Sequence, residues 1–144
     1  MSSVCEQTDA LARLREEMTR PPYHAILQPQ AVRADPAAGL VVISLAYRPE
    51  FRRGPDDPAY HGGVIATLID IAGHAAVAVH IGRMTPTIDL RIDYLRPAGA
   101  SDLTATARLV RAGRSVARAD VEIADADGRL IAIGRGSFST LDPD

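Results

Sequence analysis

The 144-residue chain contains no lysine and no tryptophan, and it has only two phenylalanines and one cysteine, Cys5. Without lysine, the protein cannot form a Schiff base with a carbonyl substrate. A single cysteine excludes a disulfide within the chain, and it excludes a metal cluster held by several thiolates of one chain. These absences remove several kinds of covalent and metal chemistry before any motif is considered.

The charges are nearly balanced, because 16 arginines face 18 acidic side chains and give a formal net charge of −2. Such a chain has no overall field to hold nucleic acid or an anionic membrane. Residues 1–9 lack a basic segment followed by an apolar run, so we expect no signal peptide and a cytoplasmic location. Apolar residues make up 47% and charged residues 24%, as in ordinary globular proteins. We expect one domain over 1–144, in which 1–22 form an N-terminal helical extension.

The most apolar stretch of the chain is Val64–Ile81, but it contains Asp70, His74 and His80. Charge in the middle of a span disfavours a membrane helix. We therefore predict a helix over 62–81 that is buried in the core of the domain, with Gly82 as its end signal.

The remaining elements follow from periodicity and from turn residues. Spacing of Leu11, Leu14 and Met18 predicts a helix over 6–19, and residues 49–60 are expected to form a loop. Period-two patterns predict strands over 25–34, 40–48, 85–97, 102–111, 115–124 and 129–139. The last four strands are expected to form an antiparallel meander. The fold class is therefore α+β, with an antiparallel sheet wrapped around a long central apolar helix and an additional N-terminal helix.

Candidate chemistry is concentrated at the sequence Tyr60-His61-Gly62-Gly63, which precedes the apolar helix. Glycines let backbone approach a ligand closely, and the first turn of a helix has free N–H groups with a partial positive charge. The Gly62–Gly63 amides are therefore a candidate site for a carbonyl oxygen that becomes an oxyanion.

Asp70 is the only acid in this apolar helix. An unpaired buried carboxylate is costly, so the residue is either a general base or nucleophile that faces a cleft, or a structural aspartate satisfied by hydrogen bonds. Two turns of helix separate it from the glycines by roughly 10–12 Å. Two antiparallel copies of the helix across a two-fold axis would bring the glycines of one chain to the aspartate of the other, which predicts a dimer.

Two motifs carry a family resemblance: His61-Gly62-Gly63-x6-Asp70, and the strand 87–98 with its ending Asp-Tyr-Leu-Arg-Pro-Ala. Together they resemble the hotdog-fold acyl-CoA thioesterases, and most of all the phenylacetate-degradation (PaaI-like) branch. The resemblance covers about residues 40–140. It implies a hotdog fold and the hydrolysis of a small or medium acyl- or aryl-CoA thioester. It also implies a homo-oligomer built as a dimer of dimers.

The resemblance further implies roles for individual residues. The Gly62 amide polarises the thioester carbonyl, Asp70 of the partner subunit activates water or attacks directly, and His61 orients the site. Thr87 hydrogen-bonds near the nucleophile. No metal or organic cofactor is implied, since coenzyme A is part of the substrate.

The acyl chain is expected in a tunnel lined by Ile65, Leu68 and Ile69. The small number of aromatic residues favours an aliphatic acyl chain, although Tyr60 could stack on an aryl group.

Pro55 departs from the family pattern, which commonly has an asparagine at this position to orient the attacking water. An alternative is therefore an acyl-CoA-binding protein without turnover, which serves as a sensor or carrier. A hotdog dehydratase is disfavoured because His74 follows Asp70 by four residues rather than five, and a purely structural domain is the last alternative.

Two further groups of residues have competing interpretations. Asp70 and His74 share a helix face and could be a hydrogen-bonded pair or metal ligands, but no third ligand has suitable spacing. Arg111, Arg114 and Arg118 cluster around a predicted hairpin. They are either a solvated face or a place for the CoA phosphates, for which Arg114 is the candidate.

Overall fold

The structure is a computed structural model that describes residues 2–142. Its helices are α1 (Ser2–Thr19), α2 (His24–Leu27) and α3 (Gly62–Ile81), with a short 3-10 turn at Pro49–Phe51. Its strands are β1 (Gln30–Asp35), β2 (Leu40–Leu45), β3 (Arg52–Gly54), β4 (Asp57–Tyr60), β5 (Thr87–Tyr94), β6 (Leu103–Ala112), β7 (Val116–Ala124) and β8 (Leu130–Ser139).

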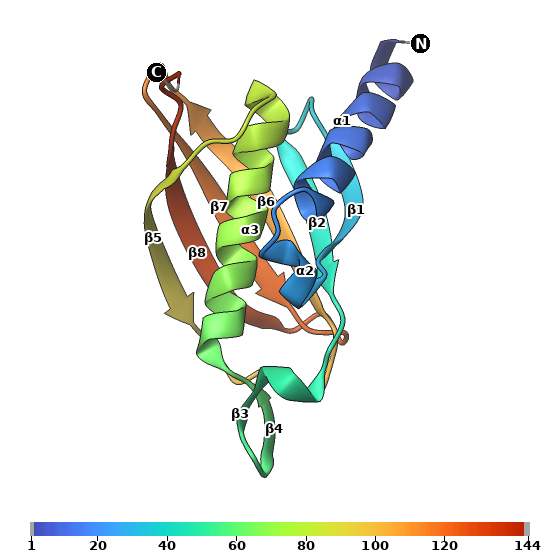
Figure 1. The fold of residues 1–144 in the computed structure, drawn as a ribbon, viewed down its shortest axis with the longest axis vertical. Coiled ribbons are helices and arrows are strands. Elements are labelled where there is room, and N and C mark those ends of the chain that lie inside the picture. The colour runs from blue at the N-terminus through green and yellow to red at the C-terminus, as the bar shows by residue number, and fades with distance from the viewer. Residues whose placement is uncertain (1, 143–144) are drawn as a thin grey trace.

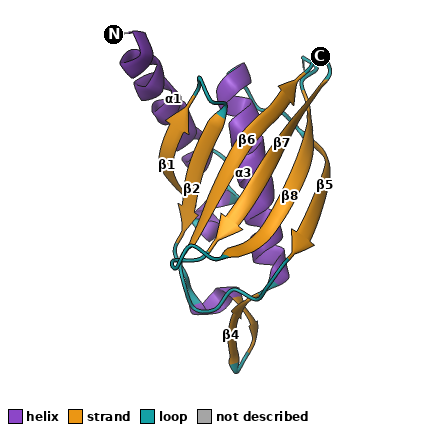
Figure 2. Ribbon diagram, turned by 180° about the vertical axis from the view of Figure 1, so that it is seen from behind, coloured by secondary structure: helices purple, strands orange, loops and turns teal. Residues whose placement is uncertain are grey.

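Six strands form one antiparallel sheet in the order β1-β2-β6-β7-β8-β5, and β3 and β4 form a separate hairpin. Helix α3 lies along one face of the sheet, whereas the opposite face is uncovered (Figures 1 and 2). This is the hotdog fold, and the expected α+β architecture is confirmed. The strand β5 forms one edge of the sheet and β1 the other.

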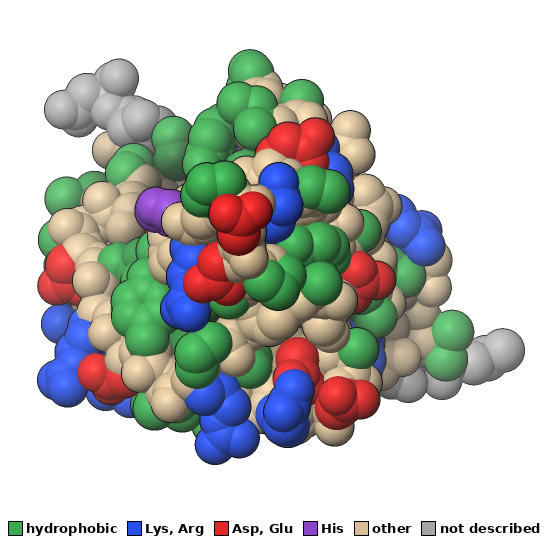
Figure 3. All heavy atoms as spheres, turned by 90° about the horizontal axis from the view of Figure 1, so that it is seen from below, with side chains coloured by type: hydrophobic (Ala, Val, Ile, Leu, Met, Phe, Trp, Pro, Cys, Tyr) green, Lys and Arg blue, Asp and Glu red, His purple; other side chains and the backbone are tan. Residues whose placement is uncertain are grey.

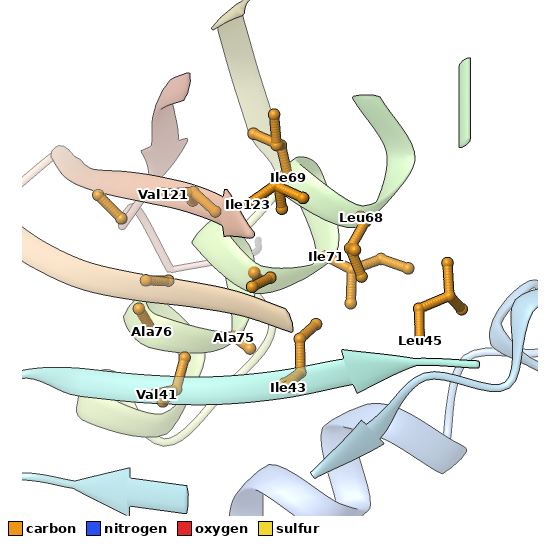
Figure 4. Close-up of a cluster of buried hydrophobic side chains, with 14 of the residues drawn as sticks. Val41, Ile43, Leu45, Leu68, Ile69, Ile71, Ala75, Ala76, Val121 and Ile123 are labelled. Atoms are coloured by element: carbon orange, nitrogen blue, oxygen red, sulfur yellow. The ribbon is translucent and has the colours of Figure 1, made fainter. Parts of the chain in front are cut away.

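The core lies between α3 and the sheet (Figure 4). Leu68 and Ile69 of α3 have no exposed surface, and they pack among side chains of β2, β7 and β8. Ile69 approaches β8 so closely at Gly134 that a Cβ there would lie 2.6 Å from its side chain. The composition of α3 is apolar enough for a membrane span, but most of that stretch is buried inside this fold.

Each end of α3 is fixed locally, and the Gly82 end is the one that the sequence predicts. His61 has an extended backbone and caps the first turn, because its Nδ1 accepts a hydrogen bond from the Gly63 N–H. Gly82 ends the helix with a left-handed φ of 88°, and its N–H donates to the carbonyl of Ala78. Such a φ favours glycine because it has no Cβ.

The N-terminal segment packs onto the rest of the domain. Ala10, Leu14 and Met18 of α1 are buried in the same core as α3, and Leu11 is partly buried. The helix begins at Ser2 rather than near residue 6.

The predicted strand over 25–34 is wrong in its first part, because 24–27 form helix α2. Gln28 then adopts a left-handed φ of 59°, and Pro29 cannot donate to a strand ladder, so β1 starts at Gln30.

The expected four-strand meander is also wrong in one connection. Strands β6, β7 and β8 are consecutive neighbours, but β5 pairs with β8 and not with β6. The link 95–102 contains Pro97 and Gly99 and is too long for a tight hairpin, so it crosses the end of the sheet instead. Residues 49–60, expected as a loop, contain the 3-10 turn and the β3–β4 hairpin.

Candidate active site

The turn that precedes α3 is held by backbone contacts from three directions. The Tyr60 N–H donates to the carbonyl of Ala98 at 2.9 Å, and the His61 N–H donates to the carbonyl of Phe51 at 2.7 Å. The Val64 N–H returns to the carbonyl of His61 at 3.0 Å. The motif His61-Gly62-Gly63 is therefore a rigid junction between β4 and α3.

Within this turn the two glycine amides are not equivalent. The Gly63 N–H is used, because it donates to His61 Nδ1 at 2.9 Å. Among residues 2–142, no acceptor is within hydrogen-bonding distance of the Gly62 N–H. A free amide at the positive end of a 20-residue helix is a donor for a developing oxyanion. Gly62 is therefore the candidate oxyanion donor of this turn, and His61 is the residue that holds the neighbouring amide.

Asp70 lies in the middle of α3 and is partly buried. Its Oδ1 accepts a hydrogen bond from Thr87 Oγ1 at 2.8 Å, so the structure brings these two predicted residues together. They line a small cleft of about 120 Å³ with His74, Thr67 and Tyr23. Tyr23 and Thr67 were not found from the sequence, since a tyrosine after two prolines and a threonine within a helix carry no signal of their own.

Gly62 faces a different and larger cleft. This cleft of about 370 Å³ is lined by Gly62, Ile65 and Tyr94 together with Arg53 and Arg96. Asp70 and Thr87 do not line it. Within one chain, therefore, the candidate oxyanion donor and the candidate base face separate spaces.

Two of the predicted substrate-binding residues, Leu68 and Ile69, line neither cleft, whereas Tyr60 lines the cleft that contains Gly62. Leu68 and Ile69 are fully buried in the core, so in this chain neither side chain lines a tunnel. Tyr60 is also buried, packs between Tyr47 and Phe51, and donates its hydroxyl to the carbonyl of Ser101. Burial raises the pKa of the Tyr60 phenol, which stays neutral. Tyr60 thus lines the Gly62 cleft while its ring is held against two other aromatic rings.

The arginines are distributed differently from the prediction as well. Arg114 is exposed in the β6–β7 turn, at the end of the sheet opposite to the start of α3 (Figure 1). Arg53 and Arg96 instead flank the cleft that contains Gly62. Arg53 also pairs with Asp57, with 2.5 Å between Nε and Oδ2. At the end of the molecule where α3 begins, arginines and acidic side chains are interspersed, and no patch of one sign dominates (Figure 3).

His74 is not paired with Asp70 as a metal site, and no cluster of three metal-ligating side chains exists among the described residues. Its Nε2 accepts a hydrogen bond from the Thr85 N–H at 3.2 Å, which leaves the proton on Nδ1. That nitrogen lies 3.9 Å from Oε2 of Glu17, a buried residue of α1. Burial, as the largest effect, lowers the pKa of His74 below 6.5, although Glu17 and Asp70 oppose the shift.

Pro55 occupies the tip of the β3–β4 hairpin. It is exposed, and its carbonyl accepts a hydrogen bond from Arg52 at 3.0 Å. Because the hairpin projects from the end of the domain (Figure 1), position 55 is outside both clefts of the described chain. The family's asparagine therefore has no counterpart in the Asp70 cleft.

Comparisons with known proteins agree with this fold and motif. A family model described as the thioesterase superfamily matches residues 59–132. A Saccharolobus solfataricus protein, provisionally named an esterase, is 36% identical over 105 residues, which are 72% of this chain and 73% of that protein. The medium/long-chain acyl-CoA thioesterase YigI of Escherichia coli K12 is 37% identical over 94 residues, or 54% of this chain. The alignment spans only 60% of YigI.

Solved structures extend the likeness to almost the whole chain. A thioesterase-superfamily protein with 32% identity superimposes with a TM-score of 0.86 over 92% of this chain and 98% of its own. A phenylacetic acid degradation-related protein from Ralstonia eutropha has 27% identity and a TM-score of 0.79, over 90% of this chain and 98% of its own. The chain belongs to the thioesterase superfamily, and the predicted family resemblance is confirmed.

Proposed function

We propose that the protein is an acyl-CoA thioesterase that hydrolyses an acyl-CoA thioester to a free acid and coenzyme A. The observation that carries the proposal is the free Gly62 N–H at the start of α3, on the same helix as a partly exposed Asp70 held by Thr87. An oxyanion donor and a positioned carboxylate are the two groups that hydrolysis of a thioester requires. Family membership and the name of YigI support the same chemistry.

In the proposed reaction, the carboxylate of Asp70 takes a proton from a water molecule whose oxygen bonds to the thioester carbon. The carbonyl oxygen becomes an oxyanion, and the Gly62 N–H donates to it. The carbon–sulfur bond then breaks, and the CoA thiolate leaves with the proton that Asp70 received. The sequence of steps balances without a metal or an organic cofactor, because coenzyme A belongs to the substrate.

We propose that the active unit is a dimer in which Gly62 of one chain works with Asp70 of the other. This follows from the separate clefts that the two residues face within one chain. The edge strand β5 offers the surface, because its outer backbone groups have no strand partner among the described residues. Its side chains Ile88 and Tyr94 are 56% and 53% exposed. Unpaired edges with apolar side chains favour pairing with another copy.

A pair of dimers and a cytoplasmic location are further parts of the proposal, and nucleic acid and membranes are not among the proposed partners. For the acyl group we propose an aliphatic chain of medium length. The Gly62 cleft is lined by the aliphatic Ile65 and Leu95, and the two tyrosines that also line it, Tyr60 and Tyr94, have their hydroxyls held by backbone carbonyls. The name of YigI, a medium/long-chain thioesterase, points in the same direction.

In place of Arg114 we propose Arg53 and Arg96 as the contacts of the CoA phosphates, since both are exposed arginines at the mouth of the Gly62 cleft, through which the rest of the CoA would extend. Arginine suits phosphate because its planar fork donates two hydrogen bonds. Arg96→Gln should raise KM for acyl-CoA and weaken its dependence on salt, with kcat nearly unchanged. Arg114→Gln is the matched control, and an equal rise in KM for that variant would refute the assignment.

A panel of short, medium, long and aryl acyl-CoA esters, with thiol release as the readout, tests the proposed activity. Hydrolysis that is fastest for medium aliphatic esters is the expected result. Tight binding of the same esters without thiol release would instead support a non-catalytic acyl-CoA-binding protein, the alternative motivated by a proline at position 55 in place of asparagine. If the protein neither binds nor hydrolyses these esters, both the enzyme and the binding-protein proposals are overturned.

A further inference from the structure

Tyr94, the last residue of β5, makes a direct contact with the candidate oxyanion site. Its hydroxyl donates a hydrogen bond to the carbonyl of Gly62 at 2.8 Å. Its ring lies over the same residue, because a Cβ built on Gly62 would be 3.5 Å from three ring and hydroxyl atoms of Tyr94. The side chain is 53% exposed, so burial in the core does not account for its position.

This contact completes a clamp on one peptide unit. The carbonyl of Gly62 and the N–H of Gly63 belong to the same peptide plane. Tyr94 donates to the carbonyl, and His61 Nδ1 accepts from the N–H at 2.9 Å. The plane is therefore held at both of its polar atoms, from β5 on one side and from the helix cap on the other, in addition to the helical hydrogen bonding of the first turn of α3.

The neighbouring peptide unit contains the Gly62 N–H, the group without an acceptor. Its carbonyl end, that of His61, is held by the Val64 N–H at 3.0 Å. The two planes meet at the Cα of Gly62, where no side chain restricts the torsion angles. When the Gly62–Gly63 peptide plane is fixed, the His61–Gly62 plane that contains the free N–H can rotate less about the Gly62 Cα. Donors that are fixed before the reaction stabilise a transition state without a cost of reorganisation.

We propose that Tyr94 is a positioning residue that fixes the direction of the Gly62 N–H. The inference rests on the proposed function, in which that N–H receives the oxyanion. Tyr94 acts through the Gly62 peptide and its hydroxyl proton stays on the phenol throughout. Its ring also closes one side of the cleft between Gly62 and Arg96, so the hydroxyl and the ring have separable roles.

Tyr94→Phe tests the hydroxyl alone, since phenylalanine retains the ring over Gly62. Loss of one hydrogen bond of ordinary strength should lower kcat about three- to tenfold. KM should stay within about twofold, because the oxyanion forms only in the transition state. Tyr94→Leu, which also removes the ring, should raise KM in addition. Tyr47→Phe is the matched control, because that hydroxyl donates to a carbonyl outside both clefts, that of Pro58.

A double-mutant cycle separates positioning from a general structural effect. If Tyr94 acts through the Gly62 amide, Tyr94→Phe should cost much less in a Gly62→Ala background than in the wild type. Additive losses would show that Tyr94 does not work through Gly62. Sedimentation of each variant at the assay concentration confirms that the oligomeric state is unchanged.

Amide hydrogen exchange supplies a readout that does not depend on activity. The Gly63 N–H should exchange faster in Tyr94→Phe than in the wild type, whereas amides in the middle of α3 should not change. Unchanged exchange together with unchanged kcat would overturn the inference while leaving the thioesterase activity standing. If the wild type hydrolyses no ester, the proposed function fails, and the exchange result still decides whether Tyr94 fixes this peptide.

Discussion

Thr87 donates a hydrogen bond to Asp70, with 2.8 Å between Thr87 Oγ1 and Asp70 Oδ1. The contact joins the first residue of β5 to the middle of α3, and both residues line the same cleft. One carboxylate oxygen is thereby oriented, and Oδ2 has no hydrogen-bond donor among the described residues. A base held in this way can accept a proton from water through its second oxygen.

Replacing Asp70 by asparagine should abolish most of the activity without unfolding the protein. General-base catalysis is worth about 100- to 10,000-fold, so we expect kcat to fall by at least about 100-fold. The melting temperature should hold, because an amide is cheaper to bury than a carboxylate. Asp9→Asn, the same change on an exposed face of α1, is the control. A stable Asp70→Asn variant with wild-type turnover would end the proposed mechanism.

Thr87→Val keeps the shape of the side chain but removes the donor to Asp70. A hydrogen bond to a charged group is worth about 1.5–3 kcal/mol, so kcat should fall roughly 10- to 100-fold if this orientation matters. Thr87→Ser retains the hydroxyl and should keep most of the activity. Equal rates for the valine and serine variants would show that the hydrogen bond has no catalytic role.

Gly63→Ala should destabilise the protein, whereas Gly62→Ala should leave its stability nearly unchanged. The backbone of Gly62 does not have a positive φ, and a Cβ there meets Tyr94 at an ordinary 3.5 Å, so the fold should tolerate alanine. A Cβ on Gly63 would lie 2.9 Å from His61 Nδ1 and would displace the helix cap.

Thermal melting and thiol release measured on both variants check this prediction. Gly62→Ala should keep its melting temperature and lose about ten- to 100-fold in kcat. The reason is that the new methyl group displaces the thioester carbonyl of the substrate from the Gly62 N–H. Gly63→Ala should melt earlier, because loss of a helix cap costs about 1 kcal/mol. A Gly62→Ala variant with unchanged turnover would remove this residue from the mechanism.

Mixing two inactive variants tests whether the site is shared between chains. A heterodimer of Gly62→Ala and Asp70→Asn would contain one site with both wild-type residues. Random exchange of subunits should then restore about a quarter of the wild-type activity, because half of the dimers are mixed and each has one working site. A mixture that stays inactive after exchange, as monitored by mass, would place both residues of each site in the same chain.

The partly buried His74 predicts a loss of stability in mild acid. Its pKa in the folded protein is below 6.5, mainly because burial disfavours the charged ring. Below about pH 6.5 the unfolded chain therefore binds a proton that the folded chain does not, and the free energy of unfolding decreases as the pH falls. The loss ends once the pH is below the folded-state pKa.

Urea unfolding at about pH 7.5, 6.5 and 5.5 measures this dependence. His74→Gln offers an amide oxygen to the Thr85 N–H but does not titrate, so its stability should change less over this range. Glu17, Asp70, His24 and Arg20 are the other charged groups that act on the His74 ring. His80→Gln, on the exposed end of α3, is the control and should keep the wild-type slope.

The sequence by itself determined the local features of this protein. The apolar run that ends at Gly82 defined α3, because helical periodicity and end signals act within a few residues. The turn at 35–39 and the hairpins between β6, β7 and β8 followed from glycine and aspartate for the same reason. The motif of His61, Gly62 and Asp70 also pointed to the superfamily before the fold was known.

Only the tertiary structure decided how distant segments meet. It placed β5 beside β8 and Glu17 of α1 near His74, and it brought the Tyr94 hydroxyl to Gly62 across 32 positions of the chain. It also assigned Leu68 and Ile69 to the core, whereas their apolar character fitted a tunnel equally well. Periodicity records which side of an element is apolar, but the partner on that side depends on the packing of the whole chain.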